Sequence, residues 1–396
     1  MAGEEGPPSL PRSAALDRLP SYPLADIPER KRALAEKGVD VIDLGPGDAN
    51  LPPPPRAVAR LHEVVDEPRY SRYGFQLGLP EFREEVAAWM KARFGVSLDP
   101  FREIHPLVGS KEGITHLSLA CLSPGDVGIV PDPAFHAYRG GVVLAGGEPH
   151  FVPLRPENDF RIPLDELPDH VVERARILFL NYPNNPTAAS VDLDYLERAV
   201  AFCRKNGIVL VHDQAYSEVA FDGYHPPGVL QVPEGRSVAV EFHSLSKTYN
   251  MTGWRLGWVA GNRELIESLV RVKSFIDTGP FLAVQAAGVE ALRSHREWLP
   301  ENVETFRRRR DAAVMALRKA GFTLESPKAT MYLWVSVPEG FSSEGFAREA
   351  LDRAGVVVMP GSALGEGGEG FFRIALTDTE ERLQEGARRL GELRRG

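Results

Sequence analysis

Apolar and polar residues follow two different periods along this chain. Short apolar runs rich in β-branched residues, at 128–132, 177–180, 207–213 and 237–243, end in polar or turn-forming residues and predict buried strands. Segments with the spacing of amphipathic helices lie between them, as at 194–206. Because strands that alternate with helices indicate βαβ units, the pattern predicts an α/β fold with a mostly parallel sheet.

The two ends of the chain follow another pattern. An amphipathic helix is predicted at 26–38, and the segment VDVIDLGPGD after it favours a short strand that enters a glycine turn. LPPPP at 51–55 cannot form a helix or a central strand, so we interpret it as a rigid connector. A long helix at 304–321, followed by short strands and a further helix, predicts a second, smaller α/β unit.

The length of the chain predicts more than one domain. Its 396 residues exceed the size at which a single hydrophobic core usually stops growing. We therefore expect a proline-rich N-terminal arm at 1–20, a small domain made of 21–50 and 295–396, and a large domain at 51–294. We also expect a strand at 254–260 and a solvated helix face for the four arginines at 307–310.

Composition and charge narrow the class of protein. The formal net charge is −9, and no basic face or nucleic-acid motif is present, which argues against a nucleic-acid partner. The N-terminus lacks the features of a signal peptide, and no apolar run is long enough to span a bilayer, so we expect a cytoplasmic protein without a membrane partner. Cys121 and Cys203 have neither disulfide nor metal-ligand spacing, which predicts buried, inert thiols and no metal.

The segment EFHSLSKTYNMTGWRLGW, at 241–258, carries the strongest chemical signal. It places Lys247 on a loop after a strand, three residues after Ser244 and eight before Arg255. A solvated lysine, with a pKa of about 10.4, is not a nucleophile at neutral pH, so a reactive lysine needs neighbours that hold a carbonyl compound beside it. A serine and an arginine suit an anionic handle such as a phosphate. The alternative is a surface lysine beside an ordinary core strand.

Other polar residues fall at the ends of the predicted strands or at the start of helices. Gly109, Ser110 and Lys111 precede an apolar helix, whose free N–H groups favour an anion. Asn185 follows the strand at 177–180, and Asp213 ends the strand at 207–213. In a parallel sheet these strand ends share one edge, where ligands bind, so we expect these residues to meet Lys247 there.

The ordered motifs GSKEG, PDP, FLNYPNNPT, FDGYHPP and EFHSLSKTYNMTGWRLG resemble the class I and II aminotransferases of fold type I. The pattern is most similar to the bacterial LL-diaminopimelate aminotransferases and their relatives of the aspartate aminotransferase type. The resemblance implies a mostly parallel, seven-stranded sheet with helices on both faces, a small α/β domain and pyridoxal phosphate as cofactor. It also implies a homodimer that moves an amino group between an amino acid and a 2-oxo acid, expected to be 2-oxoglutarate, in ping-pong order.

The resemblance also assigns roles to individual residues. Lys247 is the catalytic lysine that binds the cofactor and moves the substrate's α-proton. Asp213 pairs with the pyridine nitrogen, and Phe135 stacks on the ring unless it is only a core residue. The remaining cofactor contacts are assigned to Tyr73, Ser110, Lys111, Asn185, Tyr216, Ser244 and Arg255, with Tyr73 supplied across the dimer interface. The substrate contacts are assigned to Gly47, Gln76, Asn185 and Arg373, the last holding the α-carboxylate.

Several positions depart from the family pattern or leave a second interpretation open. Gln76 stands where the plant-type enzymes have a glutamate, and Ala188 where the family usually has glycine. Tyr73 is equally compatible with packing under a turn, and Arg373 with a surface ion pair. A carbon–sulfur β-lyase shares the same cofactor residues. A transcription regulator on this fold would need a DNA-binding domain, for which the N-terminal arm is too short.

Overall fold

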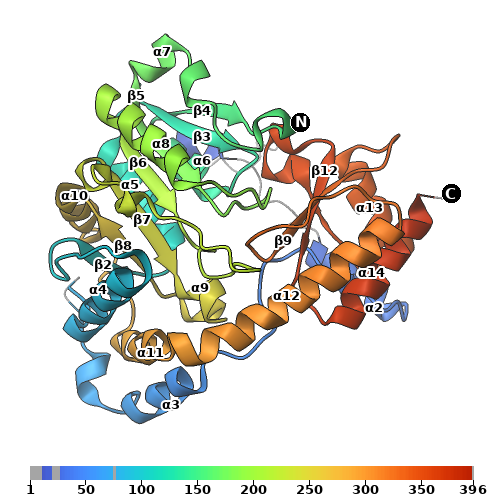
Figure 1. Cartoon of the computed structure of the whole chain (residues 1–396), viewed down its shortest axis with the longest axis horizontal. Helices are drawn as coiled ribbons and strands as arrows, with labels where there is room; N and C mark the ends of the chain where they lie inside the picture. The colour runs from blue at the N-terminus through green and yellow to red at the C-terminus, as the bar shows by residue number, and fades with distance from the viewer. Residues whose placement is uncertain (1–10, 20–26, 75–76, 395–396) are drawn as a thin grey trace, which may run out of the picture.

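The computed structural model describes residues 11–19, 27–74 and 77–394. A seven-stranded sheet in the order β2-β8-β7-β6-β5-β3-β4 runs through the large lobe (Figure 1). All pairings in this sheet are parallel except those of β8, which runs antiparallel to β2 and β7. The strands are β2 (Ile104–Leu107), β3 (Val127–Asp132), β4 (Glu148–Pro153), β5 (Ala175–Asn181), β6 (Val209–Asp213), β7 (Ala239–Ser244) and β8 (Gly257–Gly261).

Helices cover both faces of this sheet because its strands are apolar on both sides. In β5, for example, Ile177 and Phe179 belong to one buried cluster, whereas Leu178 and Leu180 belong to another. This alternation is what a strand buried on both faces requires. The first cluster is completed by α5 (Ser110–Cys121), α6 (Ala137–Leu144) and α10 (Arg263–Lys273), and the second by α4 (Pro80–Phe94), α8 (Leu193–Asn206) and α11 (Leu282–Arg293).

The small lobe has its own sheets and core. A three-stranded antiparallel sheet in the order β11-β12-β9 lies beside a parallel pair, β1 with β10. We propose that the predicted domain boundaries hold, because residues near Ile42 share one buried cluster with residues between Phe306 and Leu393. Four large-lobe residues also belong to this cluster: Ala215, Tyr216, Val219 and Phe221. The elements are α2 (Ile27–Glu36), β1 (Ile42–Asp43), α12 (His295–Lys319), β9 (Tyr332–Ser336), α13 (Ser343–Ala354), β10 (Val356–Val357), β11 (Met359–Pro360), β12 (Phe371–Ala375) and α14 (Glu380–Leu393).

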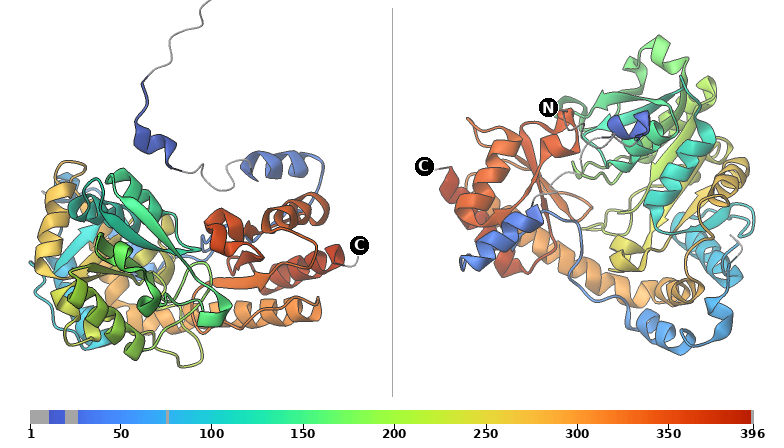
Figure 2. Two further views of the ribbon diagram at one scale, coloured as in Figure 1. Left: turned by 90° about the horizontal axis from the view of Figure 1, so that it is seen from above. Right: turned by 180° about the vertical axis from the view of Figure 1, so that it is seen from behind.

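The long helix α12 runs from the large lobe along the small lobe, as the views in Figures 1 and 2 agree. The short helices α1 (Ala14–Asp17) and α3 (Pro55–Val64) flank the first segment of the small lobe in sequence. After α1, Arg18 Nη2 donates to the carbonyl of Gly147 over 2.9 Å, so this part of the predicted arm contacts the large lobe. Within the described residues, none of the helices combines the length and apolarity needed to cross a membrane.

Three local predictions need correction. The strand predicted at 254–260 begins only at Gly257, because a 3₁₀ turn ends at Arg255, whose φ of +55° is left-handed. Lys247 lies in a short helix, α9 (Leu245–Thr248), instead of a loop. Of the four arginines, Arg309 and Arg310 are buried, since their guanidinium groups donate to small-lobe carbonyls and to Asp222.

The two cysteines lie inside the large lobe or at its margin. Cys203 is buried and Cys121 is half-buried. Burial raises the pKa of the Cys121 thiol to about 12 and also raises that of Cys203, so neither is a thiolate at neutral pH. The sequence predicts two buried thiols, and Cys121 departs from this prediction because it is only half-buried.

Candidate active site

One cavity of about 500 Å³ lies between the carboxyl ends of the large-lobe strands and the small lobe. It gathers side chains from elements far apart in sequence, in agreement with the rule that ligands bind at this edge of a parallel sheet. Of the residues singled out from the sequence, Gly47, Ser110, Lys111, Phe135, Asn185, Asp213, Tyr216, Ser244, Lys247, Arg255 and Arg373 line it.

Lys247 is delivered to the cavity by the junction of β7 and α9. Ser244 ends β7 and caps α9, since its hydroxyl accepts from the backbone N–H of Ser246 over 3.2 Å. The short helix turns the lysine back toward the small lobe, where Nζ donates to the carbonyl oxygen of Gly47. The lysine is therefore held at the boundary of the two lobes.

An anion-binding cradle lies beside Lys247, at the start of α5. Gly109 caps this helix with φ +75°, and a Cβ atom there would lie 2.3 Å from Nη2 of Arg255. A Cβ atom at Gly257 would lie 3.2 Å from the backbone nitrogen of Ser110. These glycines leave room for the guanidinium and for the free N–H groups of α5, a donor set that fits a phosphate. Partial burial and the charge of Arg255 lower the pKa of Lys111.

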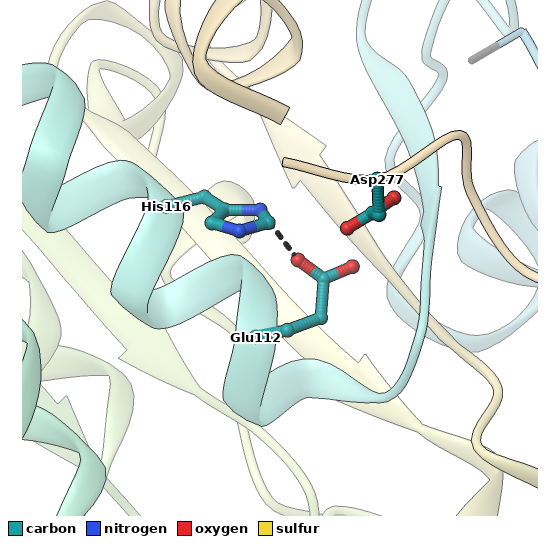
Figure 3. A group of neighbouring side chains, drawn as sticks. All are labelled: Glu112, His116 and Asp277. Carbon is teal, nitrogen blue, oxygen red and sulfur yellow. Dashed lines mark ion pairs between the residues drawn. The ribbon is translucent and has the colours of Figure 1, made fainter. Parts of the chain in front are cut away.

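A charge cluster next to this cradle includes Glu112, His116 and Asp277, which Figure 3 shows. Glu112 Oε1 accepts from the backbone N–H of Val108 over 2.8 Å and from Lys273 Nζ over 2.6 Å. Lys273 is fully buried and also pairs with Asp277 at 2.7 Å, while His116 Nδ1 lies 2.7 Å from Glu112 Oε2. The carboxylates of Glu112 and Asp277 and the imidazole of His116 lie close enough together to hold a metal ion. The ammonium group of Lys273 already provides a positive charge there, because it pairs with both carboxylates. We name these residues the Lys273 cluster.

Asp213 ends β6 and is buried at the floor of the cavity. Tyr138 Oη donates to Asp213 Oδ2 over 2.8 Å, and the N–H of Ala215 donates to Oδ1 over 3.3 Å. Burial raises the pKa of Asp213 to about 6 despite these donors. A carboxylate in this state fits a cationic partner such as a protonated pyridine, because the partner's charge would stabilise the ionised form.

Asn185 is oriented by the turn that follows β5. Asn181 Oδ1 accepts from the N–H of Asn185 over 2.8 Å, while its amide nitrogen donates to the carbonyl of Asp213 over 2.8 Å. Ala188 closes the turn with φ +59°, a left-handed conformation that favours glycine, so the family's usual glycine has a physical reason. The turn therefore forms with alanine and keeps Asn185 in the cavity wall.

Arg373 enters the cavity from β12 and is buried. Nη1 donates to Asn185 Oδ1 over 2.6 Å and Nη2 donates to the carbonyl of Gly45 over 2.8 Å. Its guanidinium carbon lies 4.1 Å from the ring centroid of Tyr332. The interpretation of Arg373 as a surface ion pair is therefore wrong.

Tyr332 is a cavity residue that the sequence analysis missed. Its hydroxyl lies 3.1 Å from that of Tyr216, and a Cβ atom at Gly47 would lie 1.9 Å from it. Burial alone would raise the pKa of Tyr332, but the positive charges of Arg373 and Lys247 act in the opposite direction. The pKa of the Tyr332 hydroxyl is therefore lowered. Only a residue without a side chain fits at position 47, which gives Gly47 a positional role.

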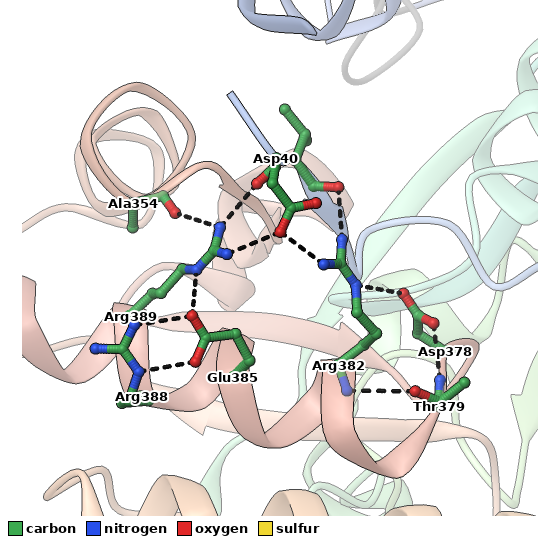
Figure 4. A network of polar contacts seen from close by, with 9 residues as sticks. Asp40, Ala354, Asp378, Thr379, Arg382, Glu385, Arg388 and Arg389 are labelled. Carbon is green, nitrogen blue, oxygen red and sulfur yellow. Dashed lines mark hydrogen bonds and ion pairs between the residues drawn. The ribbon is translucent and has the colours of Figure 1, made fainter. Parts of the chain in front are cut away.

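The strand β1 that leads to Gly47 is tied to the C-terminal helix α14 (Figure 4). Asp40 Oδ2 accepts from Arg382 Nη1 over 2.7 Å and from Arg389 Nη2 over 2.8 Å. Hydrogen bonds from Arg382 and Arg389 lower the pKa of Asp40 to about 2. The two arginines thus anchor the segment that brings Gly45 and Gly47 to the cavity.

Other residues of the site were also missed or lie elsewhere. Asn181 and His136 line the cavity, and Tyr138 is bonded to the cavity residue Asp213. These three residues had no signal beyond proximity to Phe135 and Asn185, because their roles depend on tertiary contacts. Tyr73 is 70% exposed and lines a separate surface depression with Thr278 and Phe281, outside the Lys247 cavity. Gln76 lies outside the described residues.

Comparison with known proteins identifies the family. The family model "Aminotransferase class I and II" matches residues 39–390. The chain belongs to this family. It is 46% identical over 372 residues to the LL-diaminopimelate aminotransferase of Moorella thermoacetica, covering 94% of this chain and 95% of the relative. It is 44% identical over 382 residues to the enzyme of that name from Aquifex aeolicus, covering 96% and 99%.

Solved structures share the whole fold. Substrate-bound BacF from Bacillus subtilis superimposes with a TM-score of 0.93 at 32% identity, covering 98% of each chain. Aspartate aminotransferase from Thermotoga maritima gives 0.90 at 26% identity, covering 97% of this chain and 100% of the other. The predicted fold type is confirmed, and this class I/II aminotransferase is a transaminase that uses pyridoxal phosphate, an amino acid and a 2-oxo acid.

Proposed function

We propose that this aminotransferase transfers an amino group from LL-diaminopimelate to 2-oxoglutarate. The observation that carries the proposal is that relatives 42% to 46% identical over nearly the whole chain bear the name LL-diaminopimelate aminotransferase. The cavity supports it, because one wall holds a buried arginine for the α-carboxylate and the opposite lobe supplies the cofactor donors.

The same cavity has a place for each part of the cofactor. When bound, pyridoxal phosphate supplies an aldehyde for the amino group and a ring that accepts electrons from the substrate carbon. The cradle at Gly109 and Arg255 would hold the phosphate, Asp213 would keep the ring nitrogen protonated, and Phe135 would stack on the ring. The further donors proposed are Ser110, Lys111, Asn185, Tyr216 and Ser244, which all line the cavity.

Lys247 moves the proton in this proposal. Its Nζ takes the proton from the substrate's α-carbon and later gives a proton back, acting first as base and then as acid. Arg373 holds the α-carboxylate with its planar pair of N–H donors, and Asn185, bonded to the same guanidinium, fixes its direction. Gly47 lets the Tyr332 hydroxyl approach without a clash. In this proposal these contacts would bring the α-carbon within reach of Lys247.

We also propose that the active unit is a homodimer to which Tyr73 of the partner subunit contributes a phosphate contact. Tyr73 and Phe281 line one surface depression, and exposed apolar side chains lie close by in sequence, with Leu77 63% and Phe275 89% exposed. Such a group of apolar side chains is typical of an interface. Mixing Lys247→Ala with Tyr73→Phe subunits then creates one intact site per mixed dimer, so activity should rise on mixing. No rise would contradict shared sites.

The substrate proposal is tested by steady-state assays with 2-oxoglutarate as acceptor. LL-diaminopimelate, aspartate and alanine are compared as donors under identical conditions. The proposal expects the highest kcat/KM with LL-diaminopimelate. A preference for aspartate, the donor named for the Thermotoga maritima neighbour, would replace it with an aspartate-type enzyme.

A further inference from the structure

His136 lies in the cavity wall but has no role in the function described so far. It directly follows Phe135 and precedes the first turn of α6. The centroids of the Phe135 and His136 rings are 4.7 Å apart, and both side chains line the cavity. The imidazole therefore stands next to the aromatic face assigned to the cofactor.

Lys111 shares this wall with His136. Its Nζ lies 6.0 Å from the centroid of the Phe135 ring. Burial and the positive charge of Lys111 lower the pKa of His136 to about 4, so the imidazole is neutral at pH 7 and still offers one N–H donor. The wall thus combines an ammonium charge with a neutral donor, which together suit an anion.

Three carboxylates also line the cavity: Asp43, Asp48 and Asp213. Asp213 is bound by Tyr138 at the floor, and Asp43 is paired with Lys31 on the small-lobe side. Arg373 also comes from the small lobe, whereas His136 comes from the turn after β3 in the large lobe. A substrate with carboxylates at both ends can therefore contact a cationic group on each wall.

We propose that His136 is a specificity-determining residue that donates a hydrogen bond to a carboxylate at the far end of the substrate side chain. The inference deepens the proposed function and rests on it, because LL-diaminopimelate, glutamate and 2-oxoglutarate all carry a second carboxylate. Alanine has none. His136 thereby favours substrates of one chemical class in both halves of the reaction.

The test compares single half-reactions of the cofactor-loaded enzyme with His136→Leu and His136→Gln. Loss of a hydrogen bond to a charged group predicts a fall of about 10- to 100-fold in the rate-to-affinity ratio for LL-diaminopimelate and glutamate with His136→Leu. The value for alanine should change by less than about twofold, since the lost donor has no partner there. His136→Gln keeps a donor and should recover most of the loss. An equal fall with alanine would overturn the proposal.

Equilibrium binding gives a readout independent of turnover. Calorimetric titration of the loaded enzyme with glutarate, which has two carboxylates, is compared with pentanoate, which has one. His136→Leu should weaken glutarate alone, and His62→Leu, an exposed histidine outside the cavity, should weaken neither. Unchanged glutarate binding would refute a role for His136. If LL-diaminopimelate is not a substrate but the glutarate effect appears, the substrate proposal fails and the role of His136 stands.

Discussion

Arg373 and Asn185 are 188 residues apart in sequence, yet Nη1 of the arginine donates to Oδ1 of the asparagine over 2.6 Å. The bond joins the small lobe to the turn after β5. It also fixes the guanidinium plane on the side where the substrate carboxylate is proposed to bind. Asn185 is predicted to contact both cofactor and substrate, and Arg373 is predicted to contact the substrate. The hydrogen bond joins these two predicted site residues directly.

Replacing Arg373 with lysine should mainly weaken substrate binding. Lysine keeps the charge but loses the planar pair of donors, and it cannot contact Asn185 and Gly45 together. We expect KM for the amino donor to rise by about 10- to 100-fold, the cost of one charge-assisted hydrogen bond, with a smaller effect on kcat. Arg308→Lys, on the exposed side of α12, is the matched control. An unchanged KM would remove Arg373 from the substrate site.

Lys247→Ala should fold and still bind the cofactor without catalysing transfer. The lysine Nζ donates to the carbonyl of Gly47, and Lys247 belongs to neither apolar cluster that contains the residues of β7, so its loss leaves that core intact. General acid–base catalysis contributes about 10²- to 10⁴-fold, and we expect at least that loss in kcat. Circular dichroism checks the fold. Substantial transamination by the variant would refute the assignment of Lys247.

In the cofactor-free protein, Asp213 should make the free energy of unfolding fall as the pH rises, which is the opposite of the usual effect of a carboxylate. Its pKa is raised from 3.8 to about 6 by burial, so the native state holds the proton more tightly than the unfolded chain does. The contribution is present below pH 4 and is lost as pH rises to about 6, a change of roughly 3 kcal/mol in the free energy of unfolding. Urea titrations at pH 4 and pH 7 should show this decline in the wild type and a smaller one in Asp213→Asn.

Lys273→Met should destabilise the protein and weaken cofactor binding at the same time. It leaves Glu112 and Asp277 without their shared cation, and removing one partner from a buried charge pair costs about 3 kcal/mol. Glu112 would then release the N–H of Val108, next to the phosphate cradle. Adding Glu112→Gln should recover part of the stability but not the cofactor affinity, while Lys319→Met, at the exposed end of α12, should change neither. Normal cofactor affinity in Lys273→Met would show that the Lys273 cluster does not support the phosphate cradle.

Three of the residues expected to meet in the cavity lie at or just after strand ends. Asn185 follows β5, and Asp213 and Ser244 are the last residues of β6 and β7. Parallel strands place their carboxyl ends at one edge, so sequence order alone brings these residues together. Tyr138 and Tyr332 carried no such signal, because a tyrosine on α6 and one on β9 reach the site only through tertiary packing.

The burial of two charged helix residues and the role of Tyr73 could not be predicted from the sequence either. Lys273 and Arg310 fall at positions of a helix where charge usually indicates solvent, yet both are buried because acidic partners from other elements meet them. The partner of Tyr73 would belong to a second subunit, so one chain cannot show it. The pattern within each segment thus predicts the strands, whereas contacts between segments that are far apart in sequence cannot be predicted from that pattern.

The most direct test of the central claim is a half-reaction with LL-diaminopimelate alone. The purified enzyme, loaded with pyridoxal phosphate, is mixed rapidly with LL-diaminopimelate, and the absorbance of the lysine-bound cofactor is followed without any 2-oxo acid. The account predicts rapid loss of this absorbance and its return when 2-oxoglutarate is added, with Lys247→Ala showing neither change. Failure of LL-diaminopimelate to alter the spectrum, while aspartate or alanine does so, would contradict the proposed substrate.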